Sequence, residues 1–533
     1  MRVAGKGLIN REKTLNFKFD GRSYKGFEGD TVASALLASG EKVFGRSFKY
    51  HRPRGVLTAG SEEPNALITV GQGAFQDPNV RATTQEIFEG LITRSQNNWP
   101  NLQYDILSVN DLFSNFLGAG FYYKTFMWPK SFWEKIYEPF IRRAAGLGAL
   151  SGLHNSDTYE KAYAFCDLLI IGGGPSGLIA TKIAAAAGLD VILAEQEPIF
   201  GGRLNSETEK VDGIPGSDWA TKIIEELKKL DNVRLFLRTT VTGVYDQGTF
   251  AAVERVGHHL PDRGSDRPLE CFWRIVAKNS ILAAGAIERA IAFPNNDRPG
   301  IMAASAVRTY LNRFGVSPGR SIALFCNNNT AHNTAKDLLE SGINIAAIID
   351  SREDSKTDLD VPFYNGAEVS NTFGRQGLNS IIVKKNNTES KIEVDCLAVS
   401  GGWNPTLHLT CHMNGRPTWD EKILSFVPEN GVIPNMAVVG AANGLMDTHS
   451  CFASAQKEVG LIIKASGKTA KTKRLPKAEI TKYEISPKWS VDGKGRAWLD
   501  YQNDVTVKDI QQSVQENFKS VEHMKRYTTQ GMA

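Results

Sequence analysis

The segment with the clearest chemical meaning is the glycine string GGGPSG at 172–177, which follows the apolar run DLLII at 167–171. In a turn from a buried strand into a helix, Gly172 permits the sharp bend and Gly174 lets the backbone approach a pyrophosphate. Gly177 lets the helix pack closely on the strand, and the helix N-terminus offers free N–H groups to phosphates. The string and its flanking segments therefore predict a dinucleotide-binding turn.

A carboxylate follows at the distance that such a turn requires. The next apolar segment, DVILA at 190–194, ends at Glu195, eighteen residues after Gly177. An acid at the end of this strand accepts hydrogen bonds from ribose hydroxyls in Rossmann-type domains. A carboxylate there would repel a 2′-phosphate, so the sequence favours NAD or FAD over NADP.

Three further segments end in residues suited to the same ligand. Two glycines before Arg203 permit a second backbone approach, and the arginine itself can pair with a phosphate. Val241 follows an apolar strand at the distance where this architecture places a residue over adenine. Gly440 and Ala441 follow another apolar strand, MAVV. Together these strand ends predict one large dinucleotide site.

Residues 321–350 repeat the strand–helix–strand rhythm with the segments SIALFC, AHNTAKDLLES and NIAAIID. The turn of this second unit is Asn327-Asn328-Asn329, where a binding turn requires glycine. Side chains at these positions would obstruct a diphosphate. We therefore expect the second unit to keep the topology of a nicotinamide domain without its site, which leaves one dinucleotide per chain.

The remaining reactive residues predict neither a metal site nor a catalytic residue. His408, Cys411 and His412 share a helical face, but no carboxylate completes a hydrolytic metal pattern. His449 and Cys451 have no evident acid or base partner for a nucleophile. No residue of the chain can be named as catalytic from the sequence.

The elements that position these residues indicate an α/β protein with several domains. A hairpin at 14–28, a helix at 31–39 and a strand at 65–70 are typical of a β-grasp domain. The aromatic-rich stretch 112–140, interrupted by Pro129, is either a connector packed over two domains or a docking surface for a partner subunit. The predicted domains are a β-grasp domain at 1–100, a connector at 101–162, a two-dinucleotide-binding domain at 163–463 with its second unit at about 318–400, and a basic linker with the start of a truncated domain at 464–533.

Composition and charge restrict the function classes. Sixty-two basic and 58 acidic side chains leave a net charge of +4, which is too balanced for a protein defined by nucleic-acid binding. No apolar run approaches the roughly 18 residues of a membrane span, and the charged N-terminus has no signal-peptide core. Six cysteines without a C-x-x-C pair argue against a disulfide framework or a structural zinc site. We expect a cytoplasmic protein that binds neither nucleic acid nor membrane.

The chain as a whole resembles the alpha subunits of heterotetrameric sarcosine oxidases, within the wider group of two-component amine and opine dehydrogenase subunits. The resemblance rests on the strings SFKYHRPRGV (47–56), IIGGGPSGL (170–178), LAAGAIER (282–289), SGGWNP (400–405), QNDVT (502–506) and VEHMKRYTTQGMA at the end. It implies a two-dinucleotide-binding-domain (Rossmann-like) flavoprotein/NAD fold, preceded by a ferredoxin-like β-grasp domain.

The resemblance also implies a function. The complex, with beta, gamma and delta subunits, oxidatively demethylates sarcosine to glycine, forms hydrogen peroxide and passes the one-carbon unit to tetrahydrofolate as 5,10-methylenetetrahydrofolate. FAD lies in the beta subunit, FMN at the interface with it, and NAD in the alpha subunit, without an established role in hydride transfer. By motif position, the implied NAD-binding residues are Gly172, Gly174, Ser176, Gly177, Glu195, Gln196, Glu197, Arg203, Val241, Gly440, Ala441 and Leu445.

Two departures from the family pattern refine the expectation. Relatives in dehydrogenase complexes hold a [2Fe–2S] cluster in the β-grasp domain with cysteine thiolates, but this chain has no cysteine before Cys166. A cluster is therefore excluded, which favours the sarcosine oxidase branch. Alpha subunits of this type also continue into a folate-binding, aminomethyltransferase-like region, so we expect a truncated product, a fragment or half of a split subunit without a tetrahydrofolate site.

Two other interpretations remain open. One is an FAD- and NAD-dependent oxidoreductase, either a disulfide-reductase relative or a subunit of an opine or amine dehydrogenase complex. Against the disulfide-reductase alternative, the chain has neither a C-x-x-C nor a C-x4-C redox pair. The other is a non-catalytic assembly subunit whose nucleotide site is structural.

Overall fold

The computed structural model of the 533-residue chain describes residues 1–124, 127–144, 147–262, 267–429, 431, 433–469 and 474–532. Phe126 of the aromatic stretch and residues 470–473 of the basic linker lie outside these ranges. Within them, no helix is both long enough and apolar enough to cross a membrane.

The N-terminal residues form a five-stranded sheet that covers one helix, as a β-grasp domain requires. Strands β1 and β2 form the predicted hairpin, and β1 pairs in parallel with β7. The sheet order is β2 (Arg22–Glu28), β1 (Asn10–Phe19), β7 (Leu91–Ser95), β5 (Leu67–Val70), β6 (Asp77–Arg81). Helix α1 (Val32–Ala38) begins with a capping box between Thr31 and Ser34 and buries Leu36 under the sheet. The sequence predicted the hairpin and the helix but missed β6 and β7.

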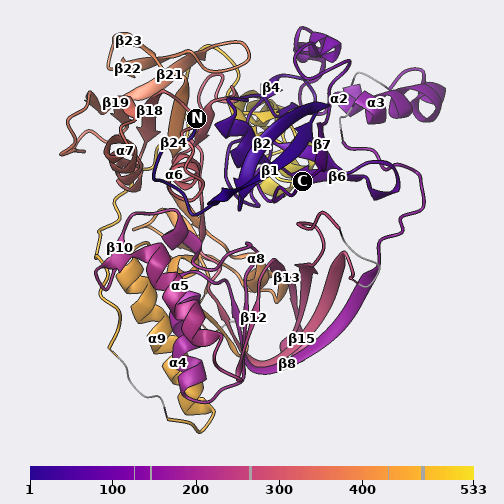
Figure 1. Ribbon diagram of the computed structural model, residues 1–533. Coiled ribbons are helices and arrows are strands. Elements are labelled where there is room, and N and C mark those ends of the chain that lie inside the picture. The colour runs from indigo at the N-terminus through magenta and orange to yellow at the C-terminus, as the bar shows by residue number, and fades with distance from the viewer. Residues whose placement is uncertain are drawn as a thin grey trace.

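The first α/β unit contains the glycine string. Its sheet is ordered β12 (Val233–Phe236), β9 (Val191–Ala194), β8 (Tyr159–Ile171), β15 (Glu270–Leu282), β14 (Thr249–Arg255), β13 (Thr239–Tyr245), and β28 (Met436–Val438) pairs with β15. Strands β12, β9, β8, β15 and β28 are parallel. Helices α4 (Pro175–Ala186), α5 (Gly216–Leu227) and α9 (Thr448–Ala465) form a layer on one face (Figure 1).

Strand β8 is longer than the sequence predicted. Its final residues, from Leu168, are buried on both faces, which produces the continuous apolar run that the sequence shows. Its earlier residues alternate, so that Tyr163 and Phe165 are exposed while Ala164 and Cys166 are buried. Two periodicities therefore occur within one strand, and the apolar run revealed only the second.

The second α/β unit has its own parallel sheet, one face of which shares a hydrophobic core with the N-terminal module. The strand order is β17 (Ile301–Ala303), β24 (Cys396–Ser400), β18 (Ser321–Cys326), β19 (Asn344–Asp350), β20 (Phe363–Asn365). Helices α6 (Ala304–Asn312) and α7 (Thr330–Glu340) pack against it, and a meander of β21 (Glu368–Phe373), β22 (Ser380–Lys385) and β23 (Thr388–Glu393) adjoins it. The predicted strand–helix–strand rhythm of 321–350 is present as β18, α7 and β19.

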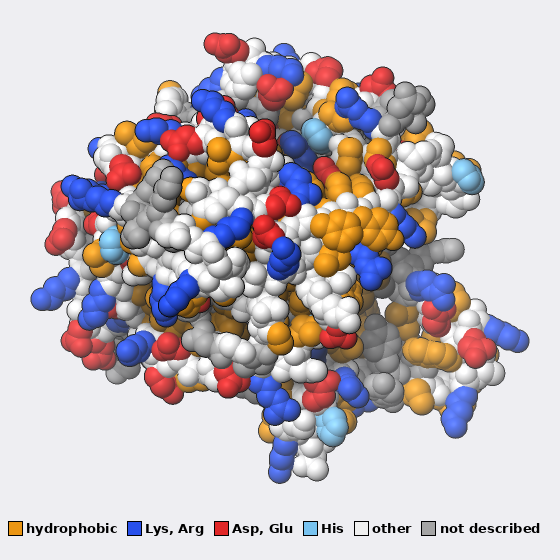
Figure 2. All heavy atoms as spheres, turned by 90° about the horizontal axis from the view of Figure 1, so that it is seen from below, with side chains coloured by type: hydrophobic (Ala, Val, Ile, Leu, Met, Phe, Trp, Pro, Cys, Tyr) orange, Lys and Arg blue, Asp and Glu red, His pale blue; other side chains and the backbone are white. Residues whose placement is uncertain are grey.

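The segment between the N-terminal sheet and β8 forms an arm at the side of the molecule. It contains short helical turns, among them α2 (Phe121–Lys124) and α3 (Glu138–Ala144), and extends away from the sheets (Figure 1). Many of its apolar side chains are strongly exposed, such as Trp128 (84%) and Leu112 (81%), whereas Ala119 and Phe121 are buried. Elsewhere, on the face that Figure 2 shows, basic and acidic side chains are interspersed. The arm is thus a concentration of apolar surface on a molecule of mixed charge.

A buried arginine joins three segments that are remote in the sequence. Arg54 pairs with Asp297 and, at 2.5 Å, with Asp504, and all three side chains are buried. The guanidinium of Arg54 also lies over the ring of Trp498, 4.6 Å from its centroid. Trp498 begins β29 (Trp498–Asp500), which pairs with β30 (Val505–Thr506) ahead of α10 (Val507–Gln515) and α11 (Val521–Thr528). We call this cluster of Arg54, Asp297, Asp504 and Trp498 the hub. It attaches the C-terminal elements to the N-terminal module, and in Figure 1 these elements lie behind that module.

Candidate functional site

The glycine turn connects the carboxyl end of β8 to the start of α4. Gly172 has a φ of +104°, and a Cβ atom there would overlap the backbone carbonyl of Ala283 at the end of β15. A Cβ atom on Gly177 would overlap the carbonyl oxygen of Gly172, so the first turn of α4 packs directly on the strand end. The turn has the geometry that the glycine spacing predicted, and neither residue can carry a side chain there.

The start of α4 is open toward this turn. Gly174 is the N-cap residue, so no side chain accepts a hydrogen bond from the first N–H groups of the helix. The nearest atom to a Cβ on Gly174 would be Cα of Gly202, at 4.0 Å. Backbone N–H groups at a helix N-terminus attract anions, because they lack acceptors and carry the positive end of the helix dipole. The α4 terminus can therefore bind phosphate oxygens.

Glu195 lies directly beside the glycine turn. Its Oε2 atom accepts a hydrogen bond of 2.7 Å from Gly173 N, and its Oε1 atom accepts one of 2.9 Å from Glu197 N. The side chain is buried, and this desolvation raises the pKa of Glu195 to about 7 although the two N–H donors act in the opposite direction. A carboxylate has about four acceptor positions, so two remain for ribose hydroxyls.

The loop that contains Arg203 covers the glycine turn. Gly201 N donates to Gly173 O at 2.8 Å, and a Cβ on Gly202 would lie 2.9 Å from Cα of Gly174. The loop therefore makes the second backbone approach that the sequence predicted. The guanidinium of Arg203, however, donates to Glu207 at 2.8 Å and to the carbonyl of Met446 at 2.6 Å. These partners compete with the phosphate contact predicted for Arg203.

A second loop reaches the turn from the end of β28. A Cβ on Gly440 would overlap Oγ of Ser176, so Gly440 and Ser176 are in direct contact. Ser176 Oγ donates to Cys451 O at 3.3 Å, and Cys451 Sγ donates to Leu445 O at 3.4 Å. Ala441 lies in the 3₁₀ turn Gly440–Asn443. Ser176, Gly440, Ala441 and Leu445 are thus brought together at the start of α4.

The other three predicted residues lie farther along the same sheet edge. Gln196 accepts a hydrogen bond of 3.4 Å from Ser61 of the N-terminal module, and Glu197 pairs with Arg313 at 3.0 Å. Val241 lies on β13, where it packs against the core beneath β8 and β15. The adenosine end of the predicted site therefore lies near the N-terminal module, which the sequence did not indicate.

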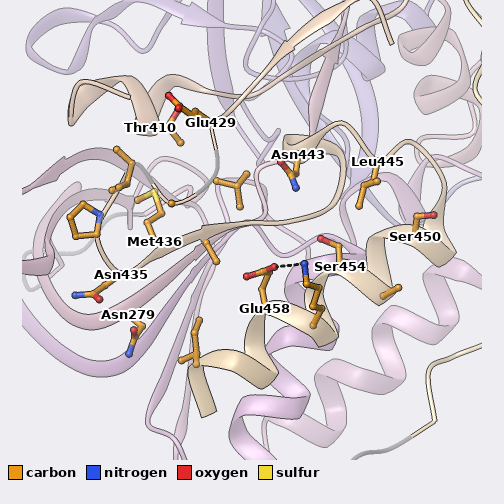
Figure 3. Close-up of a pocket in the computed structure, with 18 residues that line it drawn as sticks. Asn279, Thr410, Glu429, Asn435, Met436, Asn443, Leu445, Ser450, Ser454 and Glu458 are labelled. Carbon is orange, nitrogen blue, oxygen red and sulfur yellow. Dashed lines mark ion pairs between the residues drawn. The ribbon is translucent and has the colours of Figure 1, made fainter. Parts of the chain in front are cut away.

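A groove of about 770 Å³ borders the loop after β28. It runs between β28 and α9, and its lining includes Asn443, Leu445, Ser450 and Ser454 (Figure 3). A volume of this size is typical of small-molecule sites. Of the predicted site residues, only Leu445 lines this groove, because its walls are formed by segments that carry no glycine motif.

The structure brings together one reactive cluster that the sequence did not single out. Ligand atoms of Cys326, His332 and Asp350 all lie within 4.8 Å of one another at the carboxyl ends of β18 and β19. Asp350 accepts hydrogen bonds from His332 Nε2 at 3.0 Å and from Arg352 at 3.0 and 2.7 Å. A cation already neutralises this carboxylate, which weakens the case for a metal ion. The position of Asp350 after an apolar strand was the available signal.

Three family models match parts of the chain. Residues 12–98 match a 2Fe-2S iron-sulfur cluster binding domain, residues 167–229 an FAD dependent oxidoreductase, and residues 494–533 a sarcosine oxidase A3 domain. The second match begins just before the glycine turn and extends beyond Glu195 and Arg203.

The chain is also similar to curated proteins over nearly its full length. It is 46% identical to sarcosine oxidase subunit alpha of Rhizobium meliloti (strain 1021), in an alignment that covers 100% of this chain and 54% of that protein. It is 34% identical to the subunit of that name from Corynebacterium sp. (strain U-96), over 98% of this chain and 52% of that one. The chain thus spans about half the length of these relatives.

A solved structure has the same overall fold. L-proline dehydrogenase from P. horikoshii aligns with 99% of this chain and 90% of its own, with a TM-score of 0.66 and 19% sequence identity. At this identity the similarity establishes the arrangement of the modules and nothing about the reaction.

Proposed function

The chain is related along its whole length to the alpha subunits of sarcosine oxidases, of which it spans about half, and on this premise we propose that it is the dinucleotide-binding part of such a subunit. The resemblance seen in the motif strings is thereby confirmed. The match of residues 167–229 also assigns the first α/β unit to the FAD-dependent oxidoreductase family.

One observation carries the assignment of a dinucleotide to the first unit. The start of α4 has no side-chain cap, while Glu195 stands at the end of the neighbouring strand with acceptor positions to spare. Phosphates at the helix start and a ribose at the carboxylate are the two ends of an adenosine diphosphate. Because Glu195 would repel a 2′-phosphate, we propose NAD rather than NADP as the ligand.

FAD is the second candidate, and the match of residues 167–229 to an FAD dependent oxidoreductase favours it. Both ligands share the adenosine diphosphate that this turn would hold. Isothermal titration of the purified 533-residue chain with NAD and NADP, together with its absorption spectrum, distinguishes the possibilities. We expect NAD to bind at least tenfold more tightly than NADP. A bound flavin that absorbs blue light would replace NAD by FAD in the proposal.

The N-terminal module provides a second argument. Residues 12–98 match an iron–sulfur domain, yet the first cysteine of the chain is Cys166. Clusters of this kind are held by cysteine thiolates. We therefore propose that this module serves assembly and covers the adenosine end near Gln196, without carrying electrons through a cluster.

We propose that the oxidation takes place in a complex with beta, gamma and delta subunits as partners, with FAD in the beta subunit, FMN at the interface with it, and the tetrahydrofolate site outside residues 1–533. The substrate would be sarcosine, converted to glycine with hydrogen peroxide and 5,10-methylenetetrahydrofolate as the other products. Within the described residues, no group beside the glycine turn is arranged as an acid–base pair for amine oxidation.

The exposed apolar side chains of the arm favour the proposal that a partner subunit binds there. Apolar residues such as Trp128 and Leu112 are more than four-fifths accessible in the isolated chain, and large apolar patches on a protein surface mark interaction sites. Co-expression with a beta subunit followed by hydrogen exchange tests this proposal. We expect the arm to gain protection on assembly; unchanged exchange would contradict it.

A further inference from the structure

The crevice at the carboxyl ends of the second sheet is filled by the chain itself. Residues 482–489, here called the strap, cross the turn that joins β18 to α7. Ser486 N donates to Asn327 O at 2.9 Å, and Asn329 N donates to Glu484 O at 3.2 Å. Between these bonds, Asn328 and Ile485 form an antiparallel bridge. In a nucleotide-binding domain this turn faces the ligand.

The asparagines of the turn also bind the strap through their side chains. Asn327 Nδ2 donates to the carbonyls of Ser486 and Lys488, both at 3.0 Å. Asn329 Nδ2 donates to Lys482 O at 2.7 Å, and Asn329 Oδ1 accepts from Glu484 N at 2.9 Å. Each of these bonds joins an asparagine side chain to the main chain of the strap, so the side chains of the turn hold the strap beside the single backbone bridge.

The acidic end of the crevice is occupied in the same way. Asp350 ends β19 as Glu195 ends β9, but Arg352 binds both of its carboxylate oxygens. Arg352 Nη1 then donates to Glu484 O at 3.2 Å, which links the carboxylate to the strap. The two carboxylate oxygens of Asp350, which would accept hydrogen bonds from ribose hydroxyls, therefore accept hydrogen bonds from Arg352 instead.

The far end of the strap is fixed by an aromatic residue. Trp489 Nε1 donates to Gly401 O at 2.9 Å, beyond the end of β24. The guanidinium of Arg289 lies over this ring, 4.9 Å from its centroid. Contacts thus extend across the carboxyl ends of β18, β19 and β24.

We propose that the strap is a permanent internal occupant of the second nucleotide crevice, so that this unit takes no dinucleotide and instead fastens the C-terminal part of the chain. The contacts that carry this proposal do not depend on which cofactor binds the first unit. The strap therefore occupies the place at the carboxyl ends of the strands where a nucleotide lies in other domains of this topology.

Limited trypsin digestion of the full 533-residue chain tests the strap directly. Proteolysis of a segment reports how often it opens. Replacing both anchors, Arg352→Ala with Asn329→Ala, is expected to speed cleavage after Lys482 and Lys488 at least tenfold. Glu479→Gln is the matched control, because Glu479 is exposed and lies outside the strap, and it should leave the rate unchanged. Equal cleavage of all three proteins would overturn the proposal.

Hydrogen exchange on the unmodified chain removes the risk that the double variant fails to fold. The amides of Glu484 and Ser486 donate within the crevice and should exchange slowly, at least tenfold slower than those at 479–481, for which no such bonds are seen among the described residues. Fast exchange at both amides would show an open crevice and refute the strap.

The number of bound nucleotides separates this inference from the proposed function. Titration with NAD should give one site per chain, and Gly174→Asp should give none. A site that persists in the Gly174→Asp variant would place a nucleotide in the second crevice and overturn the inference. If the unmodified chain binds no NAD while the strap amides stay protected, the proposed NAD site fails and the strap stands.

Discussion

The two α/β units share one frame and differ in what their turns leave free. In each, a buried parallel strand leads into a helix and then into a second strand with an acid at its carboxyl end: Glu195 directly follows β9, and Asp350 is the last residue of β19. In the first unit, α4 starts at Gly174 with no side chain over its N–H groups. In the second, the amide N–H of Thr330, at the start of α7, donates to Asn328 Oδ1 at 3.1 Å.

The proposed occupation of the second crevice by the strap implies that a nucleotide-type frame and its acid do not suffice for a site. Glycine leaves the backbone donors of the turn available to an incoming ligand, whereas asparagine supplies its own donors and acceptors and binds the strap. In our proposal the second unit keeps its sheet, and the hydrogen bonds that a ligand would make are made within the protein instead.

The most severe test of this contrast places a charge in the open turn. Gly174→Asp would put a carboxylate where phosphates are expected, and we predict a loss of dinucleotide affinity of more than about 100-fold, about 2.7 kcal/mol. The fold should survive, because the φ of Gly174 is −75° and a side chain has room. Isothermal titration measures the affinity.

The matched control lies in the other turn. Asn329→Asp introduces the same carboxylate at the N-cap of α7 and should leave nucleotide affinity within about twofold, because that turn faces the strap. An equal loss in both variants would mean that the charge acts at long range and that the two turns are not distinguished.

The second test weakens the closed turn. Asn327→Ala removes the bonds from Asn327 Nδ2 to the carbonyls of Ser486 and Lys488, of which Ser486 O keeps only its bond from Lys488 N, and this should lower the free energy of unfolding by about 2 kcal/mol. Urea unfolding followed by circular dichroism measures it. Nucleotide affinity in the same variant serves as the control and should not change; a neutral effect on stability would show that the strap contributes nothing.

The third test uses pH. Burial raises the pKa of Glu195 to about 7, above its ordinary value of about 4.5, so the folded chain favours the protonated acid, and its contribution to stability is lost as the pH rises through 7. Ribose hydroxyls need an acceptor, so dinucleotide affinity should increase about tenfold from pH 6 to pH 8. Titrations at three pH values measure this increase. In Glu195→Gln the dependence should vanish, and a persistent slope would assign it to another group.

The smallest expected effect distinguishes α4 from the other helix at the first site. Asp447 caps α9 by accepting from Ser450 N at 2.9 Å, so Asp447→Ala should cost about 1 kcal/mol of stability. Because the phosphates are assigned to α4, nucleotide affinity should change less than twofold. Thermal unfolding and titration of the same sample test both parts; a large loss of affinity would move the phosphates to α9.

The sequence predicted the first unit well because its chemistry depends on missing side chains. Glycines at 172, 174 and 177 have spacing that few other structures require, and the turn, β8, α4 and β9 follow from it. The strand–helix–strand pattern of 321–350 likewise predicted the topology of the second unit, and the asparagines in its turn predicted that the unit has no dinucleotide site. The partners of Arg203, which are the Glu207 carboxylate and the Met446 carbonyl, were not predicted, because these contacts depend on how the loop around Arg203 folds.

The strap could not be predicted for a physical reason. Most of the hydrogen bonds that hold it involve main-chain atoms of 482–489, and main-chain atoms are the same for every sequence; an exception is the side chain of Trp489, which binds Gly401 and packs against Arg289. Its side chains are largely exposed or half-buried, so they form no apolar pattern. Cys326 and Asp350 meet because β18 and β19 lie side by side, and His332 reaches them from the first turn of α7.

The hub at Arg54 has a consequence for the order in which the protein is made. Arg54 and Asp504 are 450 residues apart in the sequence, yet they form a buried ion pair in the folded chain. A ribosome that adds 5–20 residues per second needs about 20–90 s to cover that interval. During synthesis, the N-terminal module therefore emerges with a guanidinium whose carboxylate partner does not yet exist. Its final packing around Arg54 must wait until Asp504 has been synthesised.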